Sequence, residues 1–514
     1  MTRLRQGSGV AGAFIAALAA IGLMAFGVAK GTWAVGGSDS SCYGLMAQAF
    51  ASGDLQPSSA LAVDAPWPDA PRTLAPGGFI PSPIRTGAAS PICAAGMSVL
   101  MAPLAAVFGR DAIFWLVPLS GAVLVWSAFV IAGRLAGGVA GATAAILTAT
   151  SPIVLFQVVQ PMNDVLAAAL WMAVFAIVVI DRPRGLSIAG FVCGLAILVR
   201  PNLAPLALVI AATPFVLKWP RPARAVAIVA AAALPGTIAM LWLNHELYGS
   251  VVASGYGAAA QLFGAGHISQ NVSNFGRAFL ETQYLVPLIG VAAPFVFTDE
   301  RRRISIVLLL GAAVVTLIYL LYHPYPEWWY LRFLIPALVL LVILTSAVGV
   351  ALASRARMGG VVPIAAMVLA IAGARAAGAR QAFELQQLEG RYRDAAALVT
   401  ARLPEHAVLI TVWPSGSIRF HADREIVMWD ALDPAWLDRA VAWLRDRGHQ
   451  PYLLIERREE PEFRTRFRGH STYGALDWPP RIDLNRQVRI YDPGDRARFL
   501  AGETYPTDLQ PRRK

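Results

Sequence analysis

The chain has 514 residues, of which 56% are hydrophobic and 15% charged, and its mean hydropathy is +0.55. Soluble domains average about 25% charged and about 45–50% apolar residues. This composition excludes an ordinary soluble enzyme, a disordered chain and a small disulfide-built secreted module. It is typical of a polytopic membrane protein. Only twelve of the 32 carboxylates lie in residues 1–380, so a long apolar part precedes a short charged part.

The formal net charge of +11 does not indicate binding of nucleic acid. The excess comes from small arginine clusters between apolar runs, which is the pattern of cytoplasmic loops. Lysine occurs only at Lys30, Lys218 and Lys514, so the chain offers almost no lysine for catalysis. We therefore expect membrane lipids, and no nucleic acid, among the partners of this protein.

Apolar runs predict the spans, because a helix needs about 20 mostly apolar residues to cross a bilayer. About eleven runs come close to this length. They lie at 9–29, 112–132, 139–158, 164–180, 186–199, 203–217, 225–243, 283–297, 304–322, 333–352 and 360–377. We expect a polytopic α-helical membrane domain over residues 1–380.

Basic residues predict the orientation, because they collect in cytoplasmic segments. They occur at the N-terminus and in alternate connections, at Arg3, Arg5, Arg134, Arg182, Arg184, Lys218, Arg221, Arg224, Arg301, Arg302, Arg303, Arg355 and Arg357. An odd number of spans then places the C-terminal part outside. We expect a multi-pass protein of the bacterial inner membrane, with a cytoplasmic N-terminus and a periplasmic C-terminal domain.

The first outward loop, residues 31–111, is rich in Pro, Gly and Ser. A loop of this length without secondary structure is uncommon. Its pattern predicts helices at 39–53 and roughly 91–108, lying along the membrane surface. Cys42 and Cys93 both fall in this loop, where they either form a disulfide or stay separate thiols. Cys193 lies in an apolar run.

The C-terminal part, residues 381–514, has the pattern of an α/β domain. Strands are predicted at 406–412, 425–429, 451–456 and 487–492. The stretch 433–448 predicts an amphipathic helix, with Asp433 as N-cap, Pro434 at the first position and Gly448 at its end. Two clusters of charged and polar residues in this part are typical of solvated faces: His421, Asp423 and Arg424, and Arg464, Arg466 and Arg468. We expect the domain to position an acceptor, dock a partner or only stabilise the fold.

Carboxylates near the outer membrane face are candidates for chemistry, because a charge there is costly. Asp39 closely follows the first span, in GGSDSSCYGLMAQAFASGDL. It can cap the following helix, act in catalysis, or do both. Asp164 opens a span in VVQPMNDVLAAALW. It either caps that helix, in competition with Asn163, or contacts a polar ligand.

Two outward arginines lie close to span ends. They are Arg200, in LAILVRPNLAPLAL, and Arg332, in PYPEWWYLRFLIPAL. Each either snorkels to lipid headgroups or binds a phosphate with its planar fork. The neighbouring aromatic residues form either an interfacial belt or a sugar-stacking wall: Tyr325, Trp328, Trp329 and Tyr330.

In their order, these segments resemble the bacterial GT-C-fold glycosyltransferases, which include aminoarabinose transferases of lipid A and protein O-mannosyltransferases. In that pattern an acidic residue and a nearby tyrosine follow the first span, here Asp39 and Tyr43. Many relatives have a second acid directly after the first, whereas here Ser40 occupies that place. The resemblance covers about residues 9–375. It includes SPIVLFQVVQPMNDVLAAALWMAVF, GLAILVRPNLAPLAL, NHELYGSVVASGYG and YLRFLIPAL.

The resemblance implies a GT-C-like membrane fold and an inverting transferase. Its donor would be a polyprenyl-phosphate-linked sugar, and its acceptor a lipid, glycan or protein. An external acid would take the proton of the acceptor hydroxyl, and arginine would stabilise the leaving lipid phosphate. Asp39 is the expected base, with Asp164 as a second catalytic acid. The expected substrate-binding residues are Tyr43, Arg200, Glu246, Tyr256 and Arg332. No cofactor is expected, and metal dependence stays undecided.

Two other functions fit the same sequence. The first is a transporter or lipid-binding protein without catalysis, although paired repeats with broken spans, which transporters usually show, are not evident. The second is an inactive assembly partner on a GT-C-like scaffold, because a fold does not establish a function.

Overall fold

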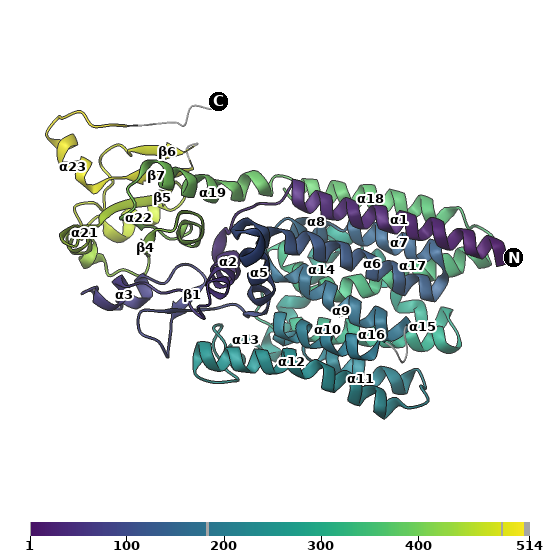
Figure 1. Ribbon diagram of the computed structural model, residues 1–514. Helices are drawn as coiled ribbons and strands as arrows, with labels where there is room; N and C mark the ends of the chain where they lie inside the picture. Colours follow the sequence, from purple (N-terminus) through teal and green to yellow (C-terminus); the bar gives the residue numbers. More distant parts are fainter. Residues whose placement is uncertain (1, 181–184, 485–486, 508–514) are drawn as a thin grey trace.

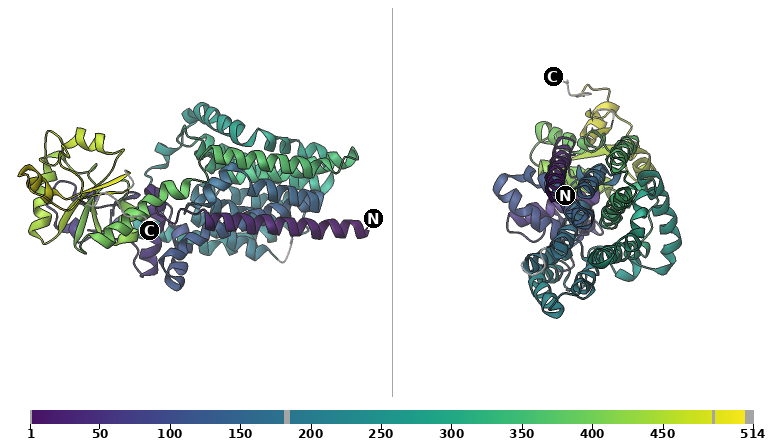
Figure 2. Two further views of the ribbon diagram at one scale, coloured as in Figure 1. Left: turned by 90° about the horizontal axis from the view of Figure 1, so that it is seen from above. Right: turned by 90° about the vertical axis from the view of Figure 1, so that its right-hand side faces the viewer.

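The computed structural model describes residues 2–180, 185–484 and 487–507 (Figure 1). Arg182, Arg184 and Lys514 lie outside the described residues, as do the side chains of Arg3 and Arg5. Long helices run side by side in a bundle, with the N-terminus at one end (Figures 1 and 2). The sheet domain and most of the 31–111 loop lie at the opposite end, so these two segments share one side of the protein.

The apolar runs of the sequence form most of the bundle. The exception is the helix Ile268–Gln283, which falls almost entirely between the predicted runs 225–243 and 283–297. The helices of the bundle are α1 (Thr2–Ala29), α6 (Leu116–Ala136), α7 (Gly138–Ala149), α8 (Pro152–Val158), α9 (Asn163–Ile180), α10 (Leu186–Val199), α11 (Leu206–Val216), α12 (Pro222–Tyr248), α14 (Ile268–Gln283), α15 (Ala293–Val296), α16 (Asp299–Leu320), α17 (Ile335–Arg355) and α18 (Val361–Ala379). Short turns extend or join them: η1 (Arg110–Trp115), η2 (Pro201–Leu203), α13 (Ala259–Leu262), η3 (Ala265–His267), η4 (Val286–Ala292) and η5 (Trp328–Leu334).

Among the described residues, seven helices are long and apolar enough to cross a membrane, and nine spans result if each of two bent pairs counts as one. The prediction of a multi-pass membrane protein is thereby confirmed. The predicted count of eleven is not confirmed, because α10 and the segment Pro201–Val216 are shorter than a full span. These two segments are nevertheless helical where the sequence predicted them.

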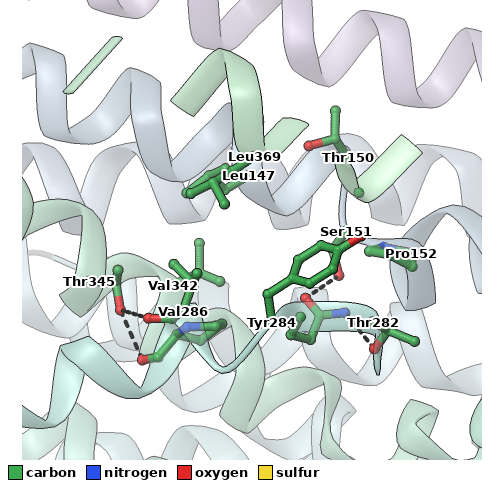
Figure 3. Close-up of a pocket in the computed structure, with 13 residues that line it drawn as sticks. Leu147, Thr150, Ser151, Pro152, Thr282, Tyr284, Val286, Val342, Thr345 and Leu369 are labelled. Carbon is green, nitrogen blue, oxygen red and sulfur yellow. Dashed lines mark hydrogen bonds between the residues drawn. The ribbon is translucent and has the colours of Figure 1, made fainter. Parts of the chain in front are cut away.

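Both bent pairs break at polar residues. The chain turns by 59° between α7 and α8, and by 104° between the segments Ala265–Gln283 and Val286–Val296. At these breaks Ser151 donates to Gln283 (3.3 Å), and Thr345 donates to the carbonyl of Pro287 (2.8 Å), beside a small cavity (Figure 3). The bond from Thr345 satisfies a backbone carbonyl at the second bend, which is one way in which irregular backbone is tolerated between membrane helices. The bond between Ser151 and Gln283 connects the two breaks through their side chains.

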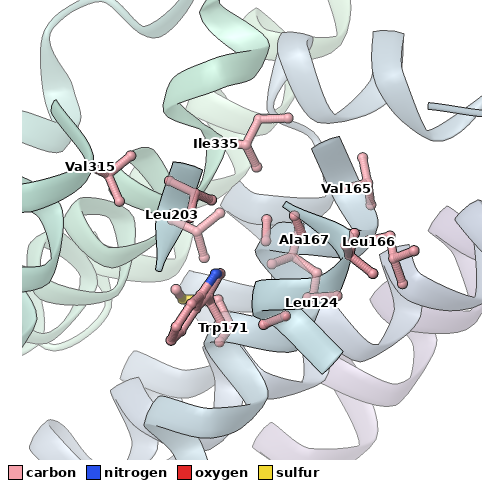
Figure 4. Packing of buried hydrophobic residues seen from close by; sticks show 14 of the residues in the cluster. Leu124, Val165, Leu166, Ala167, Trp171, Leu203, Val315 and Ile335 are labelled. Atoms are coloured by element: carbon pink, nitrogen blue, oxygen red, sulfur yellow. The ribbon is translucent and has the colours of Figure 1, made fainter. Parts of the chain in front are cut away.

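Large and very small side chains together build the bundle core. Trp171 on α9 is fully buried among aliphatic neighbours such as Leu124, Leu203 and Val315 (Figure 4). Elsewhere α10 and α12 approach each other closely at Gly194 and Gly236. A side chain at either glycine would collide with the backbone of the facing helix. Such small residues let helices pack in a membrane, where burial of apolar surface brings little gain.

The loop after α1 is folded. It contains α2 (Gly37–Ala51), α3 (Leu61–Asp64), α4 (Ala70–Thr73), the hairpin β1 (Phe79–Pro81) with β2 (Ala89–Pro91), and α5 (Gly96–Phe108). Cys42 on α2 forms a disulfide with Cys93, which settles the alternative left open by the sequence. Every residue from Ser40 to Ala47 is buried, so this part of α2 is covered by protein, and its position along the membrane surface stays a prediction.

The C-terminal part folds around a five-stranded sheet of order β4-β3-β5-β7-β6. Its strands are β3 (Ala407–Ile410), β4 (Glu425–Val427), β5 (Gln450–Glu456), β6 (Ile482–Leu484) and β7 (Val488–Tyr491). Strand β3 is parallel to β4 and β5, whereas β7 is antiparallel to β5 and β6. The helical elements are α19 (Leu385–Arg402), α20 (Ser415–Ser417), η6 (Ile418–Ala422), η7 (Pro434–Trp436), α21 (Leu437–Asp446), α22 (Glu460–Phe467) and α23 (Pro493–Leu500).

The predicted α/β pattern is confirmed, with one strand, β6, that the sequence did not indicate. Asp433 caps the predicted helix by accepting from the amide of Ala435. Neither cluster expected on a solvated face is simply solvated. His421 is half-buried and stacks on Phe114, while Arg464 and Arg466 donate to backbone carbonyls.

The loop and the sheet domain share a hydrophobic core. Leu61, Trp67 and Leu74 of the loop pack in one cluster with buried residues of β3, β5 and α21. The ring of Trp67 packs edge to face on that of Trp443, with 5.3 Å between ring centroids. The division of the chain at residue 380 stays a prediction, and this shared core shows that the loop contacts both parts.

Candidate active site

A cavity of about 690 Å³ opens between the bundle and the loop. Its walls come from α2, the start of α9, the end of α10 with η2, the end of α12, the segment 251–263, the end of α16, and η5. Elements far apart in the sequence therefore supply its lining. Six of the seven predicted site residues line it: Asp39, Tyr43, Asp164, Arg200, Tyr256 and Arg332.

Four charged side chains form a chain of contacts along this wall. Arg200 donates to Asp164 at 2.5 Å, and Arg332 donates to Asp39 at 3.1 Å. The Nε of Arg332 lies 3.9 Å from the second carboxylate oxygen of Asp164, so Arg332 joins both acids. Two arginines and two carboxylates balance in charge.

The two carboxylates differ in exposure. The side chain of Asp164 is 1% exposed, whereas that of Asp39 is 27% exposed and faces the cavity. A buried charge is tolerated only when it is paired, and Asp164 has two arginines near it. Asp39 does not cap α2, because the N-cap is Gly36 and the cap has no side-chain hydrogen bond. The wall thus carries one enclosed acid and one accessible acid.

The two arginines differ in the partners of their nitrogens. Arg200 donates its Nε to the hydroxyl of Tyr319 at 2.7 Å, and its Nη1 contacts both Asp164 and Asn163. The buried Nε of Arg332 has no hydrogen-bond partner among the described residues. A buried donor without a partner costs about 1–3 kcal/mol, which an incoming acceptor would recover. Arg332 therefore has a guanidinium donor that is unused among the described residues, whereas the Nε of Arg200 is bonded to Tyr319.

Aromatic rings hold both guanidinium groups in place. Phe333 contacts both groups, with 5.3 Å between its ring centroid and each guanidinium carbon. Tyr330 also contacts Arg332, and it stacks on Tyr325 with 4.0 Å between centroids. Cation–π contacts restrict a guanidinium without using its hydrogen-bond donors.

Two of the four residues considered as a belt or a sugar wall face the cavity, namely Tyr325 and Tyr330. Trp328 instead packs edge to face on Phe156, with 4.9 Å between ring centroids. Trp329 is 38% exposed and does not line the cavity. The aromatic run thus divides between the cavity and its surroundings.

Tyr43 lies one helical turn after Asp39 on α2. Its burial, followed by the nearby charges of Asp39 and Asp164, raises the pKa of Tyr43 well above its ordinary value. The phenol therefore stays neutral and can donate a hydrogen bond into the cavity.

The last two predicted residues lie near the end of α12. Tyr256 lines the cavity from the segment that follows this helix. Glu246 lies on α12 but is not part of the lining, where Asn244 and Tyr248 of the same helix take part. The hydroxyl of Tyr248 donates to the carbonyl of Pro91 at 2.7 Å, which fixes the end of α12 to the hairpin.

Several lining residues were not predicted from the sequence. Asn202 donates to the hydroxyl of Tyr319 at 2.9 Å and so supports the partner of Arg200. Asn202 follows Arg200 by two residues, and Tyr319 places a polar atom in an apolar run. Both signals could have marked these residues. Among the described residues, no group of three or more His, Cys, Asp or Glu side chains could hold a metal ion.

Comparison of solved structures places this geometry in a known fold. ArnT from Cupriavidus metallidurans superposes with a TM-score of 0.55 at 15% identity, over 86% of this chain and 93% of that one. The chain has the GT-C fold. Its resemblance to GT-C proteins, expected from the sequence, is confirmed.

Other comparisons agree with the GT-C assignment. ArnT bound to undecaprenyl phosphate superposes with a TM-score of 0.56 at 14% identity, over 88% of this chain and 94% of that one. The archaeal oligosaccharyltransferase AglB from Archaeoglobus fulgidus gives 0.54 at 12% identity, over 90% and 71%. A family model for dolichyl-phosphate-mannose-protein mannosyltransferase matches residues 90–245. A sequence search of curated proteins gives no match.

Proposed function

We propose that this protein is an integral-membrane glycosyltransferase that moves a sugar from a polyprenyl-phosphate donor to an acceptor on the periplasmic side of the inner membrane. The observation that carries the proposal is Arg332, which joins an accessible acid, Asp39, to an enclosed one, Asp164, in a cavity wall. A transferase of this kind needs a proton acceptor and a phosphate ligand within one sugar's reach, and this wall offers both. The GT-C fold and the undecaprenyl phosphate bound by ArnT support the choice of donor.

Asp39 is the proposed general base. Its carboxylate is partly exposed to the cavity and stands in the first turn of α2. A general base must lie within hydrogen-bond reach of the hydroxyl that it deprotonates, so an accessible carboxylate is required. Asp164 meets this requirement less well, because its side chain is 1% exposed and paired with Arg200.

Arg332 is the proposed ligand of the donor phosphate. Its Nε is unpartnered, and its bond to Asp39 can be exchanged for one to a phosphate oxygen. A planar guanidinium can bind two oxygens of one phosphate at once. This exchange would also release Asp39 at the moment when the donor is present.

Arg200 and Asp164 have a supporting role in this proposal. Arg200 already uses its donors on Asp164, Asn163 and Tyr319. The buried carboxylate of Asp164, paired with Arg200, also attracts the guanidinium group of Arg332. Sequence analysis made Arg200 and Arg332 equal candidates for the phosphate ligand, whereas their bonding patterns favour Arg332.

The proposed reaction balances in atoms and charge. The acceptor oxygen attacks the anomeric carbon of the donor sugar, and its proton passes to the Asp39 carboxylate. The bond between that carbon and the lipid phosphate oxygen breaks, and the phosphate leaves with the bonding electron pair. Arg332 would stabilise the added negative charge on this phosphate, which is the term that usually contributes most to catalysis. Attack from the face opposite the leaving group would invert the anomeric centre.

The lining of the cavity fits a lipid-linked sugar. The rings of Tyr325 and Tyr330, with the neutral Tyr43, offer stacking surfaces and hydroxyl groups for a sugar. Met240, Leu241 and Phe263 supply an apolar side suited to the first isoprene units. The volume of about 690 Å³ lies in the range of small-molecule sites, about 300–1,000 Å³.

The test is donor turnover by purified protein in nanodiscs, measured as release of polyprenyl phosphate from a panel of polyprenyl-phosphate sugars in the presence of lipid, glycan and peptide acceptors. Wild type, Asp39→Asn and the matched control Asp54→Asn are compared. Asp54 lies in the same loop and is exposed outside the cavity. We expect wild type and Asp54→Asn to release polyprenyl phosphate, and Asp39→Asn to lose about 10²–10⁴-fold in rate, the usual contribution of a general base.

The alternatives give different results. Tight donor binding without turnover in wild type would refute the transferase and favour the lipid-binding or inactive-partner reading. Equal turnover by wild type and Asp39→Asn would keep the transferase but refute Asp39 as base, and Asp164→Asn would then be compared. Binding is measured with undecaprenyl phosphate alone, so that it does not depend on the sugar.

A further inference from the structure

Helix α2 has two functional sides. Asp39 and Tyr43 are four residues apart, so they lie on one side of the helix and line the cavity. Ser41 and Gly44 lie on a different side, where α2 meets the sheet domain. The helix that carries the proposed base is thus held between the cavity and the segment Ser415–Ala422 of the sheet domain, which comprises α20 and η6.

The fit between Gly416 and Ser41 leaves no free space. A β-carbon added at Gly416 would lie 2.1 Å from the β-carbon of Ser41, which no real pair of carbons allows. One turn further along α2, a β-carbon at Gly44 would lie 3.4 Å from the ring of Phe420. The absence of a side chain at Gly416 therefore allows α2 to approach the sheet domain closely, and a β-carbon there would push the two apart.

Buried hydrogen bonds connect the same surfaces. Ser417 donates to the carbonyl of Val35, just before α2, at 2.7 Å. Ser415 accepts from the amide of Gly77 at 3.0 Å, and Ser41 donates to the carbonyl of Gly77 at 2.6 Å. Each bond removes a polar group from water, so separation of the surfaces would leave unsatisfied groups. Thus α2 cannot easily move away from the sheet domain.

The segment Ser415–Ala422 has a rigid base. It follows β3, which lies between β4 and β5 in the sheet and is buried along its whole length. None of its residues lines the cavity. Its effect on the reaction would therefore pass entirely through α2.

We propose that Gly416 and Ser417 are positioning residues, which set the place of α2 so that Asp39 faces the cavity. The sheet domain would then be a part of the catalytic apparatus and not only a docking module. This inference rests on the proposed function for its catalytic consequence. The placement of α2 itself can be measured without turnover.

The test compares wild type, Gly416→Ala, Ser41→Gly and the double variant Ser41→Gly/Gly416→Ala in nanodiscs. The double variant moves the β-carbon from one side of the contact to the other. Gly469→Ala is the matched control, because nothing lies within 4 Å of a β-carbon at that glycine. Ser417→Ala is a second route, should Gly416→Ala fail to fold. Each protein is assessed by hydrogen–deuterium exchange, donor turnover and binding of undecaprenyl phosphate.

We expect Gly416→Ala to speed amide exchange in α2 while α21, at the far side of the sheet domain, keeps its protection. Turnover should fall about 10–100-fold, as expected for a base displaced by about 1 Å. Binding of undecaprenyl phosphate should stay within about two-fold, because Arg332 is on η5. The double variant should regain part of the turnover, and Gly469→Ala should match wild type.

Two results would overturn the positioning role. One is unchanged exchange in α2 for both Gly416→Ala and Ser417→Ala. The other is loss of α21 protection together with α2, which would show a general loss of folding. Wild type without turnover, combined with selective loosening of α2 in the variants, would keep the placement of α2 and refute the proposed function instead.

Discussion

The Nε of Arg332 faces a carboxylate oxygen of Asp164 at 3.9 Å, yet it forms no hydrogen bond with any described residue. This distance is too long for a hydrogen bond and short enough for a strong electrostatic interaction. The charge of Asp164 therefore attracts the guanidinium group of Arg332, although the Nε donor remains without a hydrogen bond. A phosphate oxygen that accepted a hydrogen bond from this Nε would give the donor its missing partner.

Replacement of Arg332 by lysine should impair donor binding more than folding. Lysine keeps the charge but lacks the fork and the Nε, and a charge-assisted hydrogen bond contributes about 1.5–3 kcal/mol. We expect undecaprenyl phosphate to bind about 10–100-fold more weakly to Arg332→Lys, as measured by titration in nanodiscs. Arg200→Lys is the comparison. It should lower Tm more than Arg332→Lys does, and it should weaken binding of undecaprenyl phosphate less. The reverse order would assign the phosphate to Arg200.

Removal of the charge of Asp164 should destabilise the protein. Asp164→Asn leaves Arg200 buried without its main counter-ion, and loss of one partner of a buried pair costs about 3–5 kcal/mol. Asp39→Asn breaks a more exposed pair, for which about 0–1 kcal/mol is expected. Thermal unfolding in detergent should therefore give a clearly lower Tm for Asp164→Asn only. Equal Tm values would show that Arg200 finds another counter-ion.

The disulfide between Cys42 and Cys93 should support α2. It closes a separation of 51 residues, for which chain entropy predicts a stabilisation of about 4 kcal/mol. The double variant Cys42→Ala/Cys93→Ala should have a lower Tm and faster amide exchange in α2. Cys193→Ala, which removes the buried free thiol, serves as control. Maleimide labelling of the denatured wild type should modify Cys193 alone until reductant is added; labelling of all three cysteines beforehand would contradict the bond.

His421 should make the protein sensitive to acid. Burial, and then the charges of Arg393 and Arg110, lower the pKa of His421 to about 3. The unfolded chain binds a proton near pH 6.5, so the stability that depends on neutral His421 is present above pH 6.5 and is lost as the pH falls toward 3.

The matching variant is His421→Phe, which cannot be protonated and keeps the stack on Phe114. Between pH 7.5 and pH 5 it should lose about 2 kcal/mol less stability than wild type. Tm in detergent at the two pH values measures this difference, with the exposed His470→Gln as control. A parallel fall in Tm for wild type and His421→Phe would show that His421 is already protonated or accessible in the folded state.

Local pattern was sufficient for the elements of this fold. Apolar runs marked most of the long bundle helices, and Asp433 with Pro434 marked the start of η7 and α21. The helix α14 was missed, because its sequence is not apolar enough to stand out as a span. The strand β6 was missed because three residues at a sheet edge carry little periodic signal. The burial of α2 was also missed. Its surroundings include residues of the sheet domain, such as Gly416, which are distant in sequence.

The sequence by itself determined that this is a membrane protein with a GT-C-like order of spans, with Asp39, Asp164, Arg200 and Arg332 near span ends. Only the tertiary structure decided how these four divide their roles. The pairing of Arg332 with Asp39 joins residues 293 positions apart, and no local spacing encodes such a contact. Exposure and unsatisfied donors depend on which helices pack together, so the accessible acid and the unsaturated arginine emerge only after the chain has folded.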